Sequence, residues 1–362
     1  MPEPLRIGFL HLGNPHEGIS RYGRVLADAM RSLDDVEVIE RTAQASDGRA
    51  AGLCSLIAAV AGLSGADATV VQYSRHWLWA KGPLRLLQLA LVHTALRGRA
   101  LVVMHDVVRR ANVGRAEDWS IQLNLLMSRA VIVHGAHERE RLSEWPRRGR
   151  VITVPHFIEP RTLPAREAAR QQFQVERDEI VLGMVGWIHP RKNHAAAIET
   201  VVALGRPARL WIVGATPENV EHYAAELIAL SRRIGVEDRV EITGYVSDEE
   251  LDARLAAVDV ALCPYNDASA SGSMATLLGA RRRIVATDLP AFRELQELVD
   301  GRLELVRQPT PACLAEAVHR ILVGDSTVGG NTTEAIAAFS PEAVARKYID
   351  AALASSRSRR AA

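Results

Sequence analysis

The chain has 362 residues, more than one hydrophobic core usually serves, so we expect two domains. Its 44 Lys and Arg residues balance 43 Asp and Glu residues, which argues against a nucleic-acid binder. The three cysteines, Cys54, Cys263 and Cys313, fit neither a zinc pattern nor a disulfide framework, and this pattern indicates a reducing cytoplasm.

The N-terminal residues MPEPLRIGFLHLG pass directly into a strand-like run, so no secretory signal peptide is expected. The most apolar stretch, residues 82–99, contains Arg85 and Gln88 and is too short and polar for a membrane span, which needs roughly 18 apolar residues. It is either a buried helix or a helix lying on a membrane surface. Trp77 and Trp79, next to basic residues, keep the second alternative open. We therefore expect a cytoplasmic protein, with or without peripheral contact at the inner face of the membrane.

Short apolar runs alternate with amphipathic segments along the whole chain. The first series of strand-like runs covers residues 5–11, 36–40, 68–73, 100–105, 130–134 and 150–156. The second series covers residues 179–187, 208–214, 239–245, 258–265, 283–288 and 303–306. Helical patterns lie between them, for example over 19–33, 224–235 and 248–258. Continuous Val- and Ile-rich runs predict strands buried on both faces, so we expect an α/β protein with two Rossmann-like, doubly wound parallel sheets.

Residues 159–178 interrupt this alternation, because they contain two prolines, many charges and no long apolar run. We interpret them as a linker between an N-terminal domain, residues 1–165, and a second domain, residues 166–338. The remaining segment, 339–362, contains a predicted helix over 340–356 that starts with a Ser cap and a Pro in its first turn. We expect this helix to pack back on the N-terminal domain.

Ligands of open parallel sheets bind at the carboxyl ends of the strands, so the residues after each run are the candidates. Neither GxGxxG nor GxxxxGK[ST] is present, which disfavours a dehydrogenase and a P-loop NTPase. The first run is followed by LGNPHEGISRY, where Gly18 either lets a ligand approach the backbone or belongs to a flexible loop without a ligand. His105, with Asp106 beside it, is either a polar strand end or a functional residue.

Two candidates lie in the second domain. Arg191 and Lys192 open a helix after the first strand of that domain, as a solvated basic helix start or as a diphosphate site. The stretch DASASGSMAT, residues 267–276, places Ser271, Gly272 and Ser273 before another helix. These residues either cap the helix or present its amides to an anion, and the local sequence does not separate the two.

The order of these features resembles the retaining GT-B glycosyltransferases of family 4, the group 1 enzymes. EGISRY (17–22) is similar to the family's GGIxRY loop, and VMHD (103–106) to its first-domain His motif. GWIHPRKN (186–193) resembles the start of the second domain. VEITGYVSDEELDARLAAVDVALCPY (240–265) and RIVATD (283–288) match later passages in the right order. The resemblance covers nearly the whole chain.

The resemblance implies retaining, metal-independent transfer from a UDP- or GDP-sugar, held between the domains without a cofactor, to a glycan, lipid-linked or small-molecule acceptor. His105 would line the sugar pocket near the anomeric carbon. Gly18 would face the donor diphosphate and Lys192 would pair with it. The small residues at 271–273 would let the phosphates approach the amides of the helix start.

This sequence also departs from the family pattern. The family Arg before the Lys aligns with Trp187, and we expect Arg191 to replace it. The two family glutamates align with Ala268 and Thr276, and Asp267 is the candidate substitute for the first. The glycine and proline of the family's AxGxP pattern are replaced by Arg281 and Arg283. Two alternatives therefore stay open: a GT-B partner protein without transferase activity, and a non-hydrolysing sugar-nucleotide epimerase.

Overall fold

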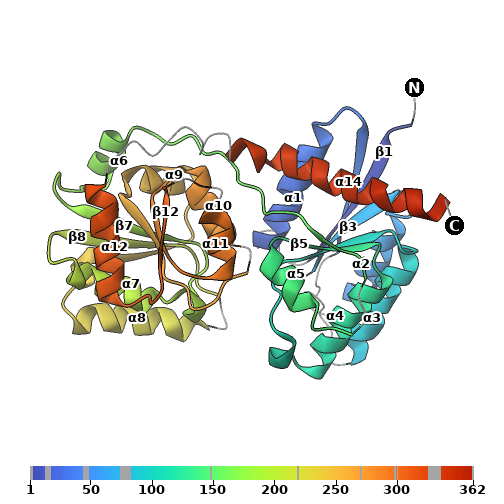
Figure 1. Ribbon diagram of the computed structural model, residues 1–362, viewed down its shortest axis with the longest axis horizontal. Coiled ribbons are helices and arrows are strands. Elements are labelled where there is room, and N and C mark those ends of the chain that lie inside the picture. The colour runs from blue at the N-terminus through green and yellow to red at the C-terminus, as the bar shows by residue number, and fades with distance from the viewer. Residues whose placement is uncertain are drawn as a thin grey trace. The chain divides into compact units, whose positions relative to one another are not determined.

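The structure is a computed structural model, and it describes residues 3–12, 18–43, 49–73, 83–146, 149–217, 220–269, 271–296, 299, 301–324 and 336–360. The chain divides into two compact units (Figure 1). Unit 1 consists of Met1–Phe157 and Phe339–Ala362, and unit 2 of Ile158–Ala338. Each unit is built on its own six-stranded sheet.

Unit 1 contains a parallel sheet in the order β2-β1-β3-β4-β5-β6. Its strands are β1 (Leu5–Leu12), β2 (Val36–Ala43), β3 (Ala68–Tyr73), β4 (Ala100–Met104), β5 (Ala130–Val133) and β6 (Val151–Thr153). Its helices include α1 (Gly18–Arg31), α2 (Arg49–Ala61), α3 (Pro83–Ala95), α4 (Arg115–Met127) and α5 (Ala136–Leu142). In this order the topological switch point lies between β1 and β3, where ligands of open α/β sheets bind.

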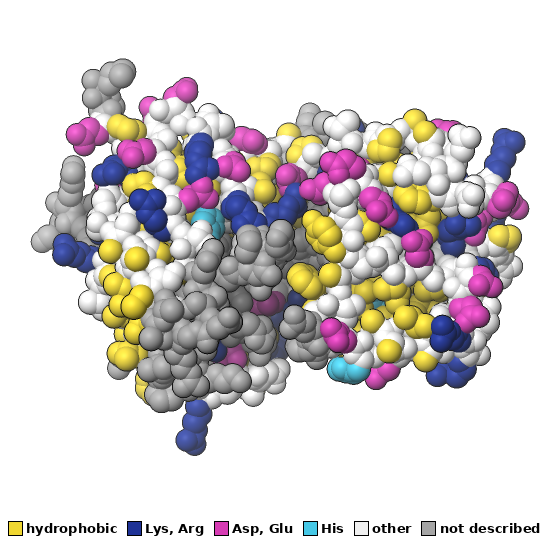
Figure 2. Space-filling view, turned by 180° about the vertical axis from the view of Figure 1, so that it is seen from behind, with side chains coloured by type: hydrophobic (Ala, Val, Ile, Leu, Met, Phe, Trp, Pro, Cys, Tyr) yellow, Lys and Arg dark blue, Asp and Glu magenta, His cyan; other side chains and the backbone are white. Residues whose placement is uncertain are grey.

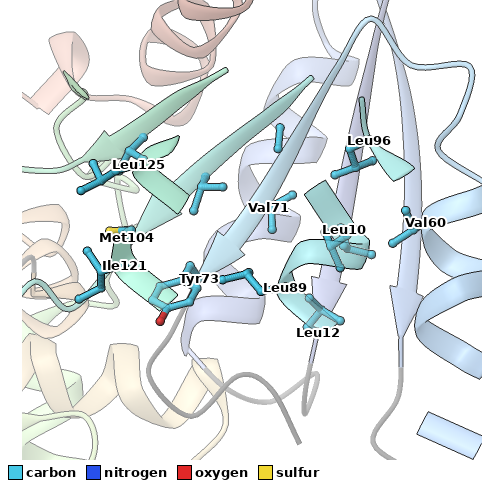
Figure 3. Packing of buried hydrophobic residues seen from close by; sticks show 14 of the residues in the cluster. Leu10, Leu12, Val60, Val71, Tyr73, Leu89, Leu96, Met104, Ile121 and Leu125 are labelled. Carbon is cyan, nitrogen blue, oxygen red and sulfur yellow. The ribbon is translucent and has the colours of Figure 1, made fainter. Parts of the chain in front are cut away.

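Alternate residues of the unit 1 strands face two different helix layers. Leu10, Val71 and Met104 pack against α2, α3 and α4, in the cluster shown in Figure 3. Their neighbours Phe9 and Val70 point to the other face and pack in the cluster that contains residues of α1. Because both faces of the sheet are covered, the inner strands β3, β4 and β5 are buried along their whole length, whereas the edge strand β2 carries charged residues.

The C-terminal helix α14 (Pro341–Arg360) belongs to unit 1. Its residues Val344, Ala345 and Tyr348 are buried in the same cluster as Leu26 of α1. The hydroxyl of Tyr348 is 3.1 Å from that of Tyr22 on α1, so the two buried phenols share a hydrogen bond. The last helix of the chain is therefore part of the core of unit 1.

Unit 2 contains a second parallel sheet, in the order β12-β11-β10-β7-β8-β9. Its strands are β7 (Ile180–Val185), β8 (Ala208–Val213), β9 (Val240–Gly244), β10 (Val260–Cys263), β11 (Ile284–Thr287) and β12 (Leu303–Val306). Its helices include α7 (His194–Ala203), α8 (Glu221–Arg233), α9 (Asp248–Ala257), α10 (Gly272–Gly279), α11 (Pro290–Gln296) and α12 (Pro311–Val323). This is the Rossmann strand order, whose switch point lies between β7 and β10.

All twelve strand predictions are confirmed, and so is the α/β fold class. The interpretation of residues 159–178 as a linker differs from the structure, because α6 (Arg166–Gln172) lies within them. Ala169 is buried beside Trp211 in the core of unit 2, and Arg170 forms an ion pair with Asp259. These contacts place the segment in unit 2, and the division lies at Phe157 rather than after residue 165.

The surface reflects the balanced composition. In the view of Figure 2, Lys and Arg side chains are interspersed with Asp and Glu side chains over the described residues. Within the described ranges, every helix is too short or too polar to cross a bilayer.

Candidate functional site

Two turns of unit 2 meet at the switch point between β7 and β10. The chain leaves β7 through Gly186 and forms a short 3-10 helix, η2 (Pro190–Lys192). It leaves β10 at Cys263 and reaches the start of α10 at Gly272. The backbone N–H of Asn266 donates to the carbonyl of Arg191 at 2.8 Å. This bond ties the two turns to each other directly.

Lys192 joins the two turns through its side chain. Its Nζ donates to the carbonyl of Val185 at 2.8 Å and to Ser273 Oγ at 3.0 Å. It also lies 5.5 Å from the ring centre of Tyr265, within cation–π distance. Burial, together with the smaller effect of the Arg191 charge, lowers the pKa of Lys192 to about 7. A buried lysine held at a helix N-terminus, with its pKa near neutrality, is typical of a functional site.

Gly186 makes this meeting possible. A Cβ on this residue would lie 2.4 Å from Ser273 Oγ and 2.9 Å from Lys192 Nζ. Its φ of +89° is also in the region that favours glycine. Gly186 belongs to the motif GWIHPRKN but was not predicted as a site residue. The clash of a side chain at Gly186 with Ser273 is visible only in the folded structure, where the two turns meet.

Of the two alternatives for the start of α10, the helix cap is present at Ser271, and the anion site stays a prediction. Ser271 is the N-cap, and its Oγ accepts from the N–H of Met274 at 3.2 Å. Ser273, inside the first turn, accepts from Lys192 instead. Gly272 is exposed. The first amides of a helix have no acceptor within the helix, so this terminus presents N–H groups and the positive end of the helix dipole.

The other predicted residues of unit 2 lie beside this turn pair. Arg191 and Asp267 are exposed, and Asp267 directly follows the residue that bonds to Arg191. Thr276 donates its hydroxyl to the carbonyl of Gly272 at 3.0 Å, so it faces the backbone of its own helix. The structure thus brings together the predicted residues Arg191, Lys192, Ser271, Gly272 and Ser273, with Asp267 and Thr276 in the adjoining loop and helix.

In unit 1, Gly18 is the first residue of α1 and is exposed. No atom lies within 4 Å of the position of a Cβ there, so packing does not require glycine. Residues 13–17 of the same loop lie outside the described residues, as do Trp77 and Trp79 of the membrane hypothesis.

His105 follows β4 directly and lies in a cluster with His134, which is also buried, and His156, which is partly buried. Its Nε2 is 2.6 Å from Oε1 of Gln72 on β3, and its Nδ1 is 3.3 Å from Nε2 of His134. His134 Nδ1 is in turn 3.1 Å from the carbonyl of Val154. His156 packs against the same Tyr22 ring as His105 and His134.

These histidines are neutral at physiological pH. Burial lowers the pKa of His134 to about 4 and that of His156 to about 3. Burial, and then the neighbouring His134, holds the pKa of His105 well below its usual range. Low pKa values of this kind follow from the cost of placing a cation in an apolar interior.

The hydrogen bonds assign the protons of the neutral cluster. His134 Nδ1–H donates to Val154, so His134 Nε2 must accept from His105 Nδ1–H. His105 Nε2 is then an acceptor. Every hydrogen bond in this series has a donor if the side-chain amide of Gln72 is oriented with its nitrogen toward His105 Nε2. That nitrogen is otherwise buried without a partner. With the amide oxygen there instead, the His105–His134 pair would need one additional proton.

His105 was predicted from the sequence, whereas its partners Gln72, His134 and His156 were not. The signal was available in part, because His134 and His156 also stand at the ends of predicted strands, in AVIVH and RVITVPH. Only the parallel sheet order, which places β4 beside β5 and β5 beside β6, brings these three strand ends together.

Solved structures share this architecture over almost the whole chain. The Anabaena protein HepE, in a structure with UDP and glucose, has a TM-score of 0.73 and 16% identity, over 96% of this chain and 98% of that chain. Sucrose-phosphate synthase from Thermosynechococcus elongatus has a TM-score of 0.70 and 19% identity, over the same shares of the two chains. Similarity at these identities shows the fold, which is GT-B.

The family model described as Glycosyl transferases group 1 matches residues 179–323. The chain has the GT-B fold, and the segment 179–323 is similar to the group 1 glycosyltransferase domain. The domain includes every site residue of unit 2, from Gly186 to Thr276. A curated relative, the 2-deoxystreptamine glucosyltransferase of Streptomyces kanamyceticus, is 29% identical over 175 residues. That match covers 46% of this chain and 41% of the relative's length.

Proposed function

We propose that this GT-B protein transfers a sugar from a nucleotide-diphosphate donor to an acceptor, and that unit 2 binds the diphosphate at the start of α10. The observation that carries the proposal is the contact of Lys192 Nζ with Ser273 Oγ, at the N-terminus of a helix and at the switch point of the sheet. The group 1 domain match and the UDP in the HepE structures support the same ligand class.

In the proposed glycosyl transfer, the site must stabilise the nucleoside diphosphate as a leaving group. When the bond between the anomeric carbon and the β-phosphate oxygen breaks, the electron pair remains on that oxygen, and negative charge grows on the diphosphate. The Lys192 ammonium and the amides of Gly272 and Ser273 would stabilise this charge without reorganising. Arg191, exposed on the adjoining turn, would add a bidentate contact.

His105 is proposed to line the sugar pocket, with Gly18 on the donor side. Its ring is neutral and is held by Gln72 and His134, so its proposed role is to orient the sugar rather than to transfer a proton. Retention of anomeric configuration and independence from metal stay part of the proposal, with Lys192 and Arg191 supplying the positive charge. Asp267 is the proposed substitute for the first family glutamate.

The acceptor is a glycan, a lipid-linked sugar or a small molecule. The name of the S. kanamyceticus relative supports a small hydroxylated acceptor. The proposed location is the cytoplasm, supported by the three cysteines, which are all free thiols.

The proposal is tested by measuring nucleotide release from a panel of UDP- and GDP-sugars, with and without 2-deoxystreptamine. We expect slow hydrolysis of at least one donor by the protein alone. We expect the rate to fall by about 100-fold in Lys192→Met, because charge-assisted groups on a leaving oxygen have effects of this size. Arg232→Gln, a change on the exposed face of α8, is the control and should keep the wild-type rate. Nucleotide binding without release from any donor would support the partner-protein alternative instead.

A further inference from the structure

Unit 2 contains a second cationic site, at the end of the sheet opposite to Lys192. A cavity of about 310 Å³ is lined mainly by arginines; its charged lining residues are Arg166, Asp259, Arg281, Arg282, Arg283 and Arg302. Asp259, Arg283 and Arg302 directly precede β10, β11 and β12. The cavity therefore lies at the amino ends of these parallel strands, whereas the site of the proposed function follows the carboxyl ends of β7 and β10.

The lining carries an excess of positive charge. Five arginines face one carboxylate, which gives a formal charge of +4. Asp259 also forms ion pairs with Arg166 and Arg170 and accepts from the N–H of Val181, so its charge is already shared. An open cavity with this excess of guanidinium groups attracts anions.

Some of the arginines also stabilise the fold through hydrogen bonds to carbonyl groups. These bonds do not remove the excess of positive charge in the cavity lining. Arg282 donates to the carbonyls of Ala280, Leu255 and Val258, near the ends of α10 and α9. Arg283 donates to the carbonyl of Ile321, near the end of α12. Helix C-termini carry only partial negative charges, so they offset part of the lining charge and no more.

The arginines also repel one another. Burial, and then the charges of Arg302 and Arg166, lowers the pKa of Arg282. Burial, and then the charges of Arg281 and Arg283, lowers the pKa of Arg302. A bound anion would relieve this repulsion.

The backbone conformation at residue 281 does not favour an arginine. Arg281 follows the C-cap of α10 and has a φ of +54°, in the left-handed region where helices commonly end in glycine. The chain therefore places an exposed guanidinium at the cavity in a conformation that a glycine would adopt more easily.

From these observations we infer that the cavity at the amino ends of β10, β11 and β12 binds a phosphate-class anion, distinct from the donor diphosphate. Planar guanidinium groups bind phosphate oxygens in pairs, and several arginines around one cavity suit a diphosphate better than a single carboxylate. The inference does not depend on the proposed transferase activity, because the two sites share no residue.

The probe is inorganic pyrophosphate, titrated into the full chain by calorimetry with saturating UDP present to occupy the site at Lys192. We expect binding that weakens with added salt. The variant Arg281→Gly should weaken it at least about tenfold, because charge-assisted hydrogen bonds to phosphate are the strong class. Arg281→Gly should also melt at the wild-type temperature or above it, since glycine suits the left-handed backbone, so that lost binding cannot be attributed to unfolding.

Arg232→Gln on α8 removes the same charge elsewhere in unit 2 and should leave the affinity for pyrophosphate unchanged. Co-sedimentation with phosphatidic acid vesicles distinguishes the source of the phosphate. Vesicle binding that Arg281→Gly abolishes, without binding of free pyrophosphate, assigns the site to a lipid headgroup. The inference is wrong if neither probe binds, or if Arg281→Gly and Arg232→Gln bind pyrophosphate equally well. If neither UDP nor GDP binds, the proposed function fails, and the titration of pyrophosphate alone still tests this cavity.

Discussion

The charge of Lys192 is the residue-scale feature on which the proposed function depends. Its ammonium is buried, which costs free energy, and it has a carbonyl, a hydroxyl and an aromatic face as neighbours. None of these three carries a formal negative charge. A diphosphate would supply that charge, so binding should raise the pKa of Lys192 above its value of about 7 in the free protein.

This linkage predicts a pH-dependent affinity for UDP. Below pH 7 Lys192 is protonated before and after binding, so its contribution is constant. Above pH 7 the free protein loses the proton and the complex retains it, so binding must take up a proton. The affinity should then fall between pH 7 and about 9, by up to tenfold per pH unit. Calorimetry in buffers of different ionisation heat measures the uptake directly, and Lys192→Met should show neither effect.

His134 predicts a loss of stability in acid. Its pKa is lowered from 6.5 to about 4 in the folded chain, so between these values the unfolded chain binds more protons. Stability is therefore highest above pH 6.5 and falls as the pH drops toward 4, by on the order of 3 kcal/mol from this residue. Urea unfolding of wild type and His134→Gln across this range checks it. Curves that stay parallel for the two proteins would show that His134 does not contribute.

The close contact at Gly186 predicts that two similar substitutions, Gly186→Ala and Gly205→Ala, differ in their effect on UDP binding. Gly186→Ala adds a Cβ 2.4 Å from Ser273 Oγ, whereas Gly205→Ala, also at positive φ, meets no atom within 4 Å. Both should lose about 1 kcal/mol from backbone strain. Only Gly186→Ala should also displace Ser273 and weaken UDP binding. Equal UDP affinity in the two variants would show that the close approach of the two turns is not needed.

At the scale of secondary structure elements, strands were easier to predict than the contacts between them. Strands buried on both faces need continuous Val- and Ile-rich runs, and β3, β4, β7 and β8 have such runs in this sequence. The short α6 was not predicted, because its single buried alanine and its ion-paired Arg170 leave a charged sequence that resembles a linker.

The packing of the C-terminal helix on α1 predicts that one substitution in α14, far from α1 in the sequence, strongly lowers the stability of unit 1. Tyr348 of α14 is 1% exposed and packs with α1. Tyr348→Ala should destabilise unit 1 by about 3–5 kcal/mol, as expected for a buried aromatic side chain. Tyr348→Phe keeps the packing and leaves the Tyr22 hydroxyl without this bond, so it should cost about 1–2 kcal/mol. Thermal melting distinguishes the two, and wild-type stability of Tyr348→Ala would contradict the packing of α14.

At the scale of the whole molecule, both candidate regions lie where the strand order predicts. The site of unit 2 lies at the β7/β10 switch point, and the strand end at His105 is at the carboxyl edge of its sheet. Sequence reasoning selected Lys192 and Ser273 separately, from a resemblance and from local composition. It could not show that they touch, because 81 residues separate them along the chain. The same limit applies to the arginine cavity, whose charged residues come from four separate segments of the chain.

The most direct test is calorimetric titration of UDP into the wild-type chain and into Lys192→Met. Methionine keeps the length of the lysine side chain and removes a buried charge, so the variant should fold with undiminished stability. We predict a single UDP site in the wild type and an affinity at least about 30-fold lower in Lys192→Met, the range expected for a lost charge-assisted contact to phosphate. UDP binding of equal strength in both proteins, or no binding to the wild type at all, would contradict the assignment of this turn pair as the diphosphate site.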